Sequence, residues 1–326
     1  MNRKGAIIAG LLALALGLTA CGSSNSSAGG AGGNGPIKLA FVQGVIGDAF
    51  YVTMQCGIQD EAAKLGATVT TNGPQKFDPS LQTPVLQSVI ASAPNAILIA
   101  PTDVSAMQQP IQQAIQQNIK VVLVDTTLKD PSIAASAIAS DNLGGGKAAF
   151  DAIHQLAPQG GKVLVVSVQP GISTTDDRAK GFQDAVKANP AYQDLGVQYS
   201  NNDPQKAAQI VNAALQANPD IVGIFATNLF SAEGSATGIR QAGKQGSVKV
   251  VGFDAGPDQV KALQAGTVQA LVAQQPALIG KDGVDQAVAA LKGQPVTKSI
   301  GTGFTVLTQA NLNTPEGQAA VYKSSC

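Results

Sequence analysis

An internal repeat is the feature that most restricts what this chain can fold into. Residues 78–103, DPSLQTPVLQSVIASAPNAILIAPTD, align without a gap on residues 203–228, DPQKAAQIVNAALQANPDIVGIFATN. After a short insertion in the second copy, KVVLVD ending at Asp125 matches KVVGFD ending at Asp254. Each copy contains a helix-like run followed by strand-like runs. The repeat therefore predicts two lobes of one architecture with a cleft between them.

Strand-like and helix-like runs alternate from residue 37 onward, which predicts an α/β fold of two Rossmann-like lobes with parallel sheets. The expected strands are 38–43, 68–71, 96–99, 121–125, 163–168, 196–199, 222–225 and 248–253. The expected helices are 50–65, 79–91, 105–117, 176–188, 204–217 and 232–241. Beyond the repeat we expect helix 257–264, strand 268–274, helix 277–291 and a strand pair, 296–299 and 303–307. These last elements would pass between the lobes and build a hinge.

The charge balance argues against a nucleic-acid partner. Lysine plus arginine and aspartate plus glutamate both number 21, so the formal net charge is zero. A chain without an excess of cations lacks the electrostatic footprint of a nucleic-acid-binding protein.

The N-terminal residues predict export and lipid anchoring. A cationic start, an apolar run from 6 to 18 and the sequence LTAC ending at Cys21 form a signal segment. The last four of these residues resemble the lipobox of bacterial lipoproteins, in which the segment before the cysteine is removed and the cysteine is lipidated. Residues 1–21 would then comprise the signal peptide and the lipidated Cys21. An ordinary secretory signal is the alternative. Residues 22–36, GSSNSSAGGAGGNGP, have almost no apolar side chain and predict a flexible tether.

Two further cysteines predict a disulfide. With Cys21 taken by lipid, Cys56 and Cys326 remain, and thiols outside the cytoplasm tend to pair. A bridge between them would tie the extreme C-terminus to the first helix. Two unpaired thiols are the alternative.

Polar side chains follow the expected strands at matched positions of the repeat. Asp103 matches Asn228, and Asp125 matches Asp254. Because ligands of open α/β sheets bind outside the carboxyl ends of the strands, these positions predict a polar site. Turn formation after a strand is the alternative reason for Asp and Asn there.

The stretch TTDDRAKGF at 174–182 contains a cation that local rules do not explain. Thr174 or Thr175 would cap the helix, and Asp176 and Asp177 suit its first turn. Arg178 in that turn would sit at the positive end of the helix dipole. Such a departure is typical of a working site, although neutralisation by Asp176 or Asp177 is the alternative.

Six motifs in order give the chain a family resemblance. They are GDAFY at 47–51, APTD at 100–103, IASDNLGGGKAA at 138–149, RAKGF at 178–182, VVGFD at 250–254 and AQQP at 273–276. From residue 37 to 307 the chain resembles the type I periplasmic binding proteins, most closely the ribose-binding group of ABC-transporter sugar receptors. The resemblance implies two lobes joined by a hinge of three segments, near 140–141, 274–275 and 302–303. The lobes would be 37–140 with 275–302, and 141–274 with 303–326 and its tail.

The resemblance also implies ligand-binding residues. Phe50 and Tyr51 fall on the aromatic pair that packs against the sugar ring. The hydrogen-bonding positions are Asp125, Arg178, Asn228, Asp254 and Gln274. A carboxylate accepts from hydroxyls, a guanidinium offers a planar fork of donors, and an amide supplies both kinds of group.

Three of the implied ligand-binding positions depart from the ribose receptor. Asp48 stands where that receptor has Asn, Thr126 where it has Arg, and Asn202 where a second aromatic closes the ring sandwich. A monosaccharide or sugar alcohol is therefore the expected ligand, and a furanosyl autoinducer or another small polar solute is the alternative. The implied mechanism is lobe closure by a monomer that delivers the ligand to an ABC transporter permease, without a cofactor.

Three other classes of function have less support. GGGK at 144–147 lacks the Ser or Thr of a phosphate loop, and a helix start after a crossover explains it better. His154 has no second His or adjacent Cys, so the sequence predicts no metal site. A lipid-anchored glycoside hydrolase would use Asp125 and Asp254 as its carboxylate pair. A sugar-responsive repressor would need a preceding helix-turn-helix, and the chain has an export signal there instead.

Overall fold

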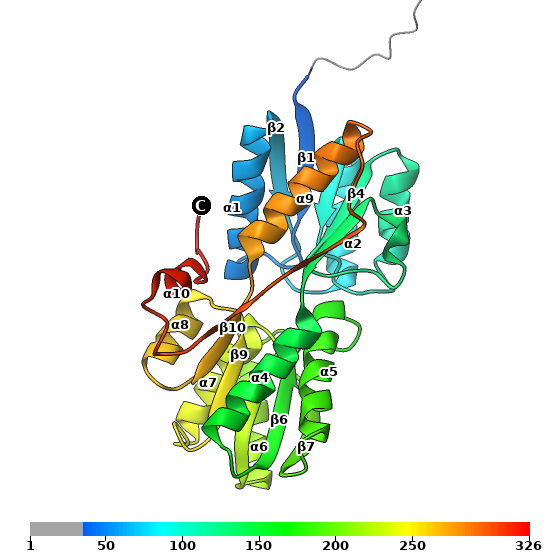
Figure 1. Ribbon diagram of the computed structural model, residues 1–326. Coiled ribbons are helices and arrows are strands. Elements are labelled where there is room, and N and C mark those ends of the chain that lie inside the picture. Colours follow the sequence, from blue (N-terminus) through cyan, green and yellow to red (C-terminus); the bar gives the residue numbers. More distant parts are fainter. Residues whose placement is uncertain (1–34) are drawn as a thin grey trace, which may run out of the picture. The chain divides into compact units, whose positions relative to one another are not determined.

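The computed structural model describes residues 35–326 (Figure 1). The predicted signal segment, the lipidation site Cys21 and almost all of the predicted tether lie outside the described residues. From residue 36 to 326 the chain forms one compact unit that contains two sheets.

The first sheet has six parallel strands in the order β11-β5-β4-β3-β1-β2. Its strands are β1 (Ile37–Val42), β2 (Ala67–Asn72), β3 (Ala96–Ile99), β4 (Lys120–Val124), β5 (Ser136–Ser140) and β11 (Ser299–Thr302). Helices α1 (Ala49–Lys64) and α9 (Pro276–Leu291) cover one face, and α2 (Pro79–Ala91) and α3 (Gln108–Gln116) cover the other. Successive residues of β3 and β4 face opposite helix layers, which accounts for their continuous apolar runs.

The second sheet repeats this order as β12-β10-β9-β8-β6-β7, and only β12 is antiparallel to its neighbour. Its strands are β6 (Gly161–Ser167), β7 (Tyr192–Tyr199), β8 (Ile221–Ala226), β9 (Lys249–Phe253), β10 (Ala270–Ala273) and β12 (Thr305–Leu307). The helices of this lobe are α4 (Asn142–Leu156), α5 (Ser173–Lys187), α6 (Pro204–Ala217), α7 (Leu229–Gln241), α8 (Pro257–Gln264) and, in the tail, α10 (Pro315–Ala319). A single 3-10 turn, Pro131–Ile133, precedes β5. The predicted α/β fold of two repeated lobes is confirmed.

The chain crosses between the sheets after β5, after β10 and after β11. Hydrogen bonds tie these crossovers together. The Asp141 N–H donates to the Thr302 carbonyl at 2.9 Å, and the Ser140 hydroxyl donates to Gln274 Oε1 at 2.8 Å. Three chain segments therefore meet at one place between the lobes.

One predicted pairing is wrong. The expected strands 296–299 and 303–307 do not pair with each other, because the chain changes lobes between them. β11 adds a parallel strand beside β5, and β12 adds an antiparallel strand beside β10. Strand β5 was missed, although its last three residues lie within a motif that gave the family resemblance.

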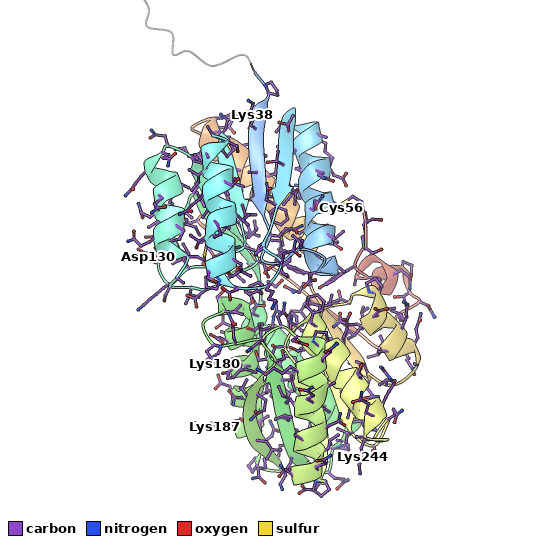
Figure 2. The ribbon with its side chains drawn as sticks, turned by 180° about the vertical axis from the view of Figure 1, so that it is seen from behind. Lys38, Cys56, Asp130, Lys180, Lys187 and Lys244 are labelled. Atoms are coloured by element: carbon purple, nitrogen blue, oxygen red, sulfur yellow. A yellow bond between two sulfur atoms is a disulfide. The ribbon has the colours of Figure 1, made fainter. Side chains whose placement is uncertain are left out.

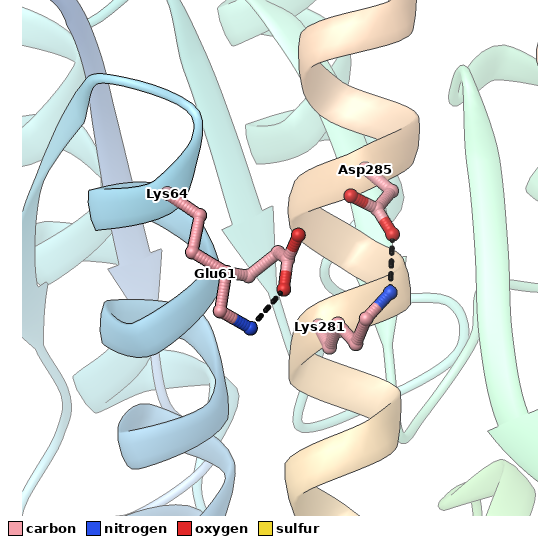
Figure 3. A network of polar contacts seen from close by, with 4 residues as sticks. All are labelled: Glu61, Lys64, Lys281 and Asp285. Carbon is pink, nitrogen blue, oxygen red and sulfur yellow. Dashed lines mark hydrogen bonds and ion pairs between the residues drawn. The ribbon is translucent and has the colours of Figure 1, made fainter.

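Helices α1 and α9 pack closely because glycines face the partner backbone. A Cβ on Gly57 would lie 2.2 Å from the Ala277 carbonyl oxygen. Figure 3 shows that each of these helices also carries its own ion pair, Glu61 with Lys64 at 2.9 Å and Lys281 with Asp285 at 2.8 Å. The Lys64 ammonium lowers the pKa of Glu61. Both lysine side chains are exposed to solvent, so these pairs add little to stability.

Cys56 on α1 and Cys326 at the C-terminus form a disulfide. Figure 2 labels Cys56 beside the end of the chain, and labels charged residues scattered over both lobes. Within residues 35–326 no helix is long and apolar enough to cross a membrane.

Candidate functional site

A cavity of about 400 Å³ lies between the two lobes. It is lined by Asp48, Phe50, Tyr51, Phe77, Asp125, Val168, Ile172, Thr174, Thr175, Arg178, Asn202, Asn228, Asp254 and Gln274. Every predicted ligand-binding residue except Thr126 belongs to this lining. The Thr126 hydroxyl instead donates to the Pro101 carbonyl at 2.7 Å, inside the first lobe, so its side chain is turned away from the cavity.

The start of α1 supplies one wall of the cavity. Asp48 caps the helix, since its Oδ1 accepts from the Phe50 N–H at 2.8 Å. Phe50 and Tyr51 follow in the first turn, with their rings edge to face at 5.1 Å. The Tyr51 hydroxyl donates to Asp125 Oδ2 at 2.8 Å. The wall thus combines aromatic surface with carboxylate acceptors.

Asp125 and Asp254 occupy matched places after β4 and β9, and both have a left-handed backbone. Their φ angles are +65° and +77°. A residue with a Cβ pays on the order of 1 kcal/mol for this conformation, and such strain collects at functional sites. Because the strain is repeated at both strand ends, it belongs to the shared architecture of the lobes and turns each carboxylate toward the cleft.

Arg178 is buried, with 3% of its surface exposed, and is held on three sides. Its Nε donates to Asn142 Oδ1 at 2.8 Å, its Nη1 donates to the Thr227 carbonyl at 2.9 Å, and its guanidinium lies 3.8 Å from the ring centre of Phe253. Its Nη2 is buried without a hydrogen-bond partner among the described residues. A buried donor without a partner is costly, so this atom marks a place for a ligand acceptor.

The predicted position of Arg178 in the first turn of its helix was wrong. Helix α5 begins at Ser173, so Arg178 lies in its second turn and Thr174 and Thr175 lie inside the helix rather than at its cap. The N-cap residue, Ile172, makes no side-chain cap. Asp176 accepts from the Gly171 N–H at 2.9 Å and so secures the loop before the helix.

Thr175 was missed as a site residue. It lines the cavity, and its Oγ1 is buried without a partner within residues 35–326, as is Arg178 Nη2. The position of Thr175 nearly one helical turn before Arg178 places both on the same face of α5. The spacing of three residues from Arg178 could have identified Thr175 as a site residue from the sequence.

Phe77 was also missed, although the repeat points to it. Phe77 precedes Asp78 as Asn202 precedes Asp203, so the two residues are repeat partners from opposite lobes, and both line the cavity. The chain therefore has an aromatic side chain at this site from the first lobe where the second lobe carries Asn202. Val168, Ile172 and Thr174 complete the lining and carried no sequence signal.

The second lobe contributes amide side chains that are hydrogen-bonded to other residues of the cavity lining. Asn228 Nδ2 donates to Asn202 Oδ1 at 2.7 Å, and Gln274 Nε2 donates to Asp254 Oδ1 at 2.7 Å. The Leu229 N–H donates to Asp254 Oδ2 at 2.9 Å. Asp103, another predicted strand-end residue, does not line the cavity and instead caps the turn after β3.

Three carboxyls share the cavity with one guanidinium. Burial and the nearby Asp254 raise the pKa of Asp48 to about 8. Burial raises the pKa of Asp125 to about 6, against the opposing effect of Arg178. Burial also raises the pKa of Asp254, again opposed by Arg178. Each of the three carboxyls already accepts a hydrogen bond from the protein, and a ligand rich in hydroxyl groups would supply further donors.

The lobes touch at the rim of the cavity. The Val104 N–H of the first lobe donates to the Gly171 carbonyl of the second at 3.0 Å, and the Thr127 N–H donates to the Ser173 hydroxyl at 2.9 Å. These contacts close the cavity over the site residues.

His154 lies away from the cavity and packs in the second lobe. Its Nδ1 is 3.1 Å from the Tyr192 hydroxyl, and its ring stacks on Phe150. Within residues 35–326 no three metal-ligating side chains gather into a group that would hold a metal ion.

Comparisons with known proteins give a consistent result. A family model described as a periplasmic binding protein domain matches residues 39–295. The ribose import binding protein RbsB of Escherichia coli strain K12 is 35% identical over 258 residues, which cover 79% of this chain and 86% of that protein. A solved structure of an ABC transporter solute binding protein from Agrobacterium vitis, bound with alpha-D-tagatopyranose, is 41% identical with a TM-score of 0.86 and covers 88% of this chain and 99% of its own. A second from Agrobacterium vitis, with bound D-fucose, is 31% identical with a TM-score of 0.84 and covers 87% of this chain and 100% of its own.

Proposed function

Because this chain belongs to the periplasmic binding protein family, we propose that it is an extracytoplasmic receptor that binds a monosaccharide or sugar alcohol between its lobes. It delivers the sugar to the permease of an ABC transporter. The relatives support this reading, since one is a ribose import binding protein and two others hold tagatopyranose and D-fucose. The chain is a binding protein and not an enzyme, so the hydrolase alternative falls away.

The buried guanidinium of Arg178 is the observation that carries the proposal. Its unpartnered Nη2 lies in a cavity with three carboxyls and several amides. A polyol is suited to this mixture, because each hydroxyl accepts one hydrogen bond and donates another. Arg178 and Thr175 donate to ligand oxygens, and Asp125 and Asp254 accept from ligand hydroxyls.

The aromatic surface of the cavity supports a sugar ligand. Phe50, Tyr51 and Phe77 provide faces for the apolar C–H side of a sugar. In the ribose receptor an aromatic side chain stands at the position of Asn202. In this chain Phe77 provides an aromatic face in its place, so a sugar can still bind.

Ligand affinity is coupled to lobe closure. The proposed lobes are 37–140 with 275–302, and 141–274 with 303–326, and they move about the three crossovers. A ligand that touches Asp125 on one lobe and Arg178 on the other favours the closed form by its differential affinity for the two states.

The N-terminal sequence supports a lipid anchor at Cys21, with 22–36 as a tether between the membrane and the receptor. The diacylglyceryl group of such an anchor has two chains, which is enough for stable attachment. The receptor works as a monomer, because one chain contains both walls of the cavity.

A thermal-shift screen tests the proposal. The purified protein is heated with pentoses, hexoses, sugar alcohols, amino acids and furanosyl signals in turn. A ligand at 100 times its Kd stabilises the folded protein by about 2.7 kcal/mol, which raises the Tm by several degrees. A shift with a sugar or polyol supports the receptor reading. Shifts only with amino acids would overturn it, and shifts only with furanosyl signals would select the alternative ligand class.

A further inference from the structure

The last residues of the chain bridge the two lobes beside the crossovers. We call residues 322–326 the C-terminal strap. At its start, the Tyr322 N–H donates to the carbonyl of Ala255 in the second lobe at 3.0 Å. The next residue reaches the first lobe, where the Lys323 N–H donates to the Thr53 hydroxyl on α1 at 2.7 Å. The strap ends in the disulfide to α1, so it is a fourth, covalently fastened connection between the lobes.

The Tyr322 side chain reaches the back of the ligand site. Its hydroxyl accepts from the Gln274 N–H at 2.9 Å and donates to Asp254 Oδ1 at 3.1 Å. Its ring packs edge to face on Phe50, with the ring centres 5.9 Å apart. Tyr322 is buried and does not line the cavity, but all three residues that it contacts do line it.

These contacts fix a carboxylate and an amide together. Asp254 Oδ1 accepts from both the Tyr322 hydroxyl and Gln274 Nε2, while the Tyr322 hydroxyl holds the Gln274 backbone. Gln274 is also the residue at a crossover, where its Oε1 accepts from Ser140. The tyrosine hydroxyl therefore locks ligand-facing groups to the hinge.

We propose that Tyr322 is a positioning residue of the ligand site and that the Cys56–Cys326 disulfide keeps it in place, so that ligand affinity depends on the oxidation state of this bond. The effect on affinity rests on the proposed sugar-binding function, whereas the hold on Gln274 does not. The strap acts through Asp254 and Gln274, and it touches no ligand itself.

The redox step is a thiol–disulfide exchange with a dithiol. One dithiothreitol gives two electrons and two protons, its sulfurs close into a cyclic disulfide, and the Cys56–Cys326 bond opens into two thiols. The strap is then attached to α1 only by hydrogen bonds, such as the one between Lys323 and Thr53. Tyr322 is freed to leave Asp254 and Gln274.

The experiment compares the oxidised protein, the dithiothreitol-reduced protein, the variant Tyr322→Phe and the double variant Cys56→Ser with Cys326→Ser. Tyr199→Phe is the matched control, because it removes a tyrosine hydroxyl from the exposed β7 surface of the second lobe. Circular dichroism first checks that each form is folded, and two quantities are then measured. One is amide hydrogen exchange at Gln274 without ligand, and the other is affinity for D-ribose and D-tagatose by calorimetry.

We expect faster exchange at Gln274 and about tenfold weaker sugar binding in Tyr322→Phe, in the reduced protein and in the double cysteine variant. Tyr199→Phe matches the wild type. Reduction of Tyr322→Phe adds little further loss, because both changes remove the same contact, and this non-additivity separates positioning from general destabilisation.

Unchanged exchange and affinity after reduction would mean that the bond only stabilises the fold, which overturns the proposal. Fully additive losses overturn it too, since the strap and the hydroxyl would then act separately. If the oxidised wild type binds neither sugar, the sugar reading is in doubt for these two ligands. The exchange rate of Gln274 still decides whether the disulfide holds Tyr322 in place.

Discussion

Arg178 carries one buried guanidinium nitrogen that has no partner within residues 35–326. We predict that Arg178→Ala weakens sugar binding at least hundredfold, because it removes a charged donor to the ligand and leaves Asp125 and Asp254 uncompensated. Arg178→Lys recovers only part of the loss, since an ammonium cannot hold Asn142, Thr227 and a ligand in one plane. Calorimetric titration with the best sugar of the screen measures both.

Arg240→Ala is the control for this prediction. Arg240 is exposed on α7, where its Nη2 donates to the Thr237 hydroxyl, and its loss leaves affinity unchanged. Wild-type affinity in Arg178→Ala, with the variant folded, would remove Arg178 from the site.

Asp48 makes the stability of the folded protein depend on pH. Its pKa is about 8 in the folded protein and 3.8 for an ordinary aspartate, so between these pH values the folded state holds a proton that the unfolded state releases. The stability from this proton is complete below pH 4 and is lost as the pH rises toward 8, by at most about 1.4 kcal/mol per pH unit. Asp48→Asn stays neutral and still caps α1. We predict that it flattens this decline, as measured by urea unfolding of the unliganded protein from pH 5 to 8.

Glu233→Gln removes a second carboxyl of raised pKa, whose charge contributes less than burial does to the raised pKa of Asp48. Burial raises the pKa of Glu233 to about 7, but Glu233 does not line the cavity. This variant flattens the fall of the unfolding free energy only up to about pH 7. It keeps the wild-type affinity for sugar. An identical pH profile in Asp48→Asn and the wild type would contradict the buried neutral state of Asp48.

At the scale of elements, the glycines of 144–147 set how near α4 comes to α5. A Cβ on Gly146 would lie 2.0 Å from the Arg178 carbonyl oxygen, and one on Gly181 would lie 2.1 Å from that of Leu143. The glycine run therefore allows close helix packing beside Arg178, the proposed ligand-binding residue, and does not bind a phosphate.

We predict that Gly146→Ala destabilises the protein by about 1–3 kcal/mol, since the added methyl forces the two helices apart. It also weakens sugar binding, because α5 carries Arg178. Urea unfolding and calorimetry measure the two effects. In the control Gly301→Ala the new Cβ meets nothing within 4 Å, so both quantities stay near the wild type. Equal behaviour of the two variants would refute the packing argument.

Two helices with strong local start signals were predicted to the residue. Helices α2 and α6 begin with Asp-Pro, in which the aspartate caps and the proline occupies the first turn, and both were predicted to the residue. Helix α5 was misplaced because it begins after Ile172, which has no capping side chain. Strands β11 and β12 were mispaired because their partners lie far away in sequence, where local pattern carries no information.

The candidate site was predictable to the extent that it follows the repeat and the strand ends. Asp125 and Asp254 stood out as matched strand-end residues, and Asn228 did so as well. Thr126 was predicted only from the family resemblance, and its hydroxyl instead donates to the Pro101 carbonyl inside the first lobe. Thr175 and Phe77 were missed because their roles depend on how α5 and the two lobes meet in space.

At the scale of the whole molecule, the proposed lobe closure predicts that affinity depends on the contacts between the lobes. The Ser173 hydroxyl accepts from the Thr127 N–H across the cleft at 2.9 Å, and it lies at the start of the helix that carries Arg178. We predict that Ser173→Ala weakens sugar binding by about threefold to tenfold, because the closed form loses one net hydrogen bond of about 0.5–1.5 kcal/mol. Calorimetry gives the affinity, and small-angle X-ray scattering with and without sugar gives the compaction on closure.

Ser247→Ala is the matched control, because the Ser247 hydroxyl donates to the Lys244 carbonyl on the surface of the second lobe and makes no contact across the cleft. The expected result is unchanged affinity in Ser247→Ala, and in Ser173→Ala a closed shape that is reached only at higher sugar concentration. Since the ligand selects the closed form by differential affinity, a closure contact must appear as a shift in that concentration. If Ser173→Ala closes at the wild-type concentration of sugar, the bond between Ser173 and Thr127 does not contribute to closure. The ligand contacts of Asp125 and Arg178 would then be sufficient to draw the lobes together.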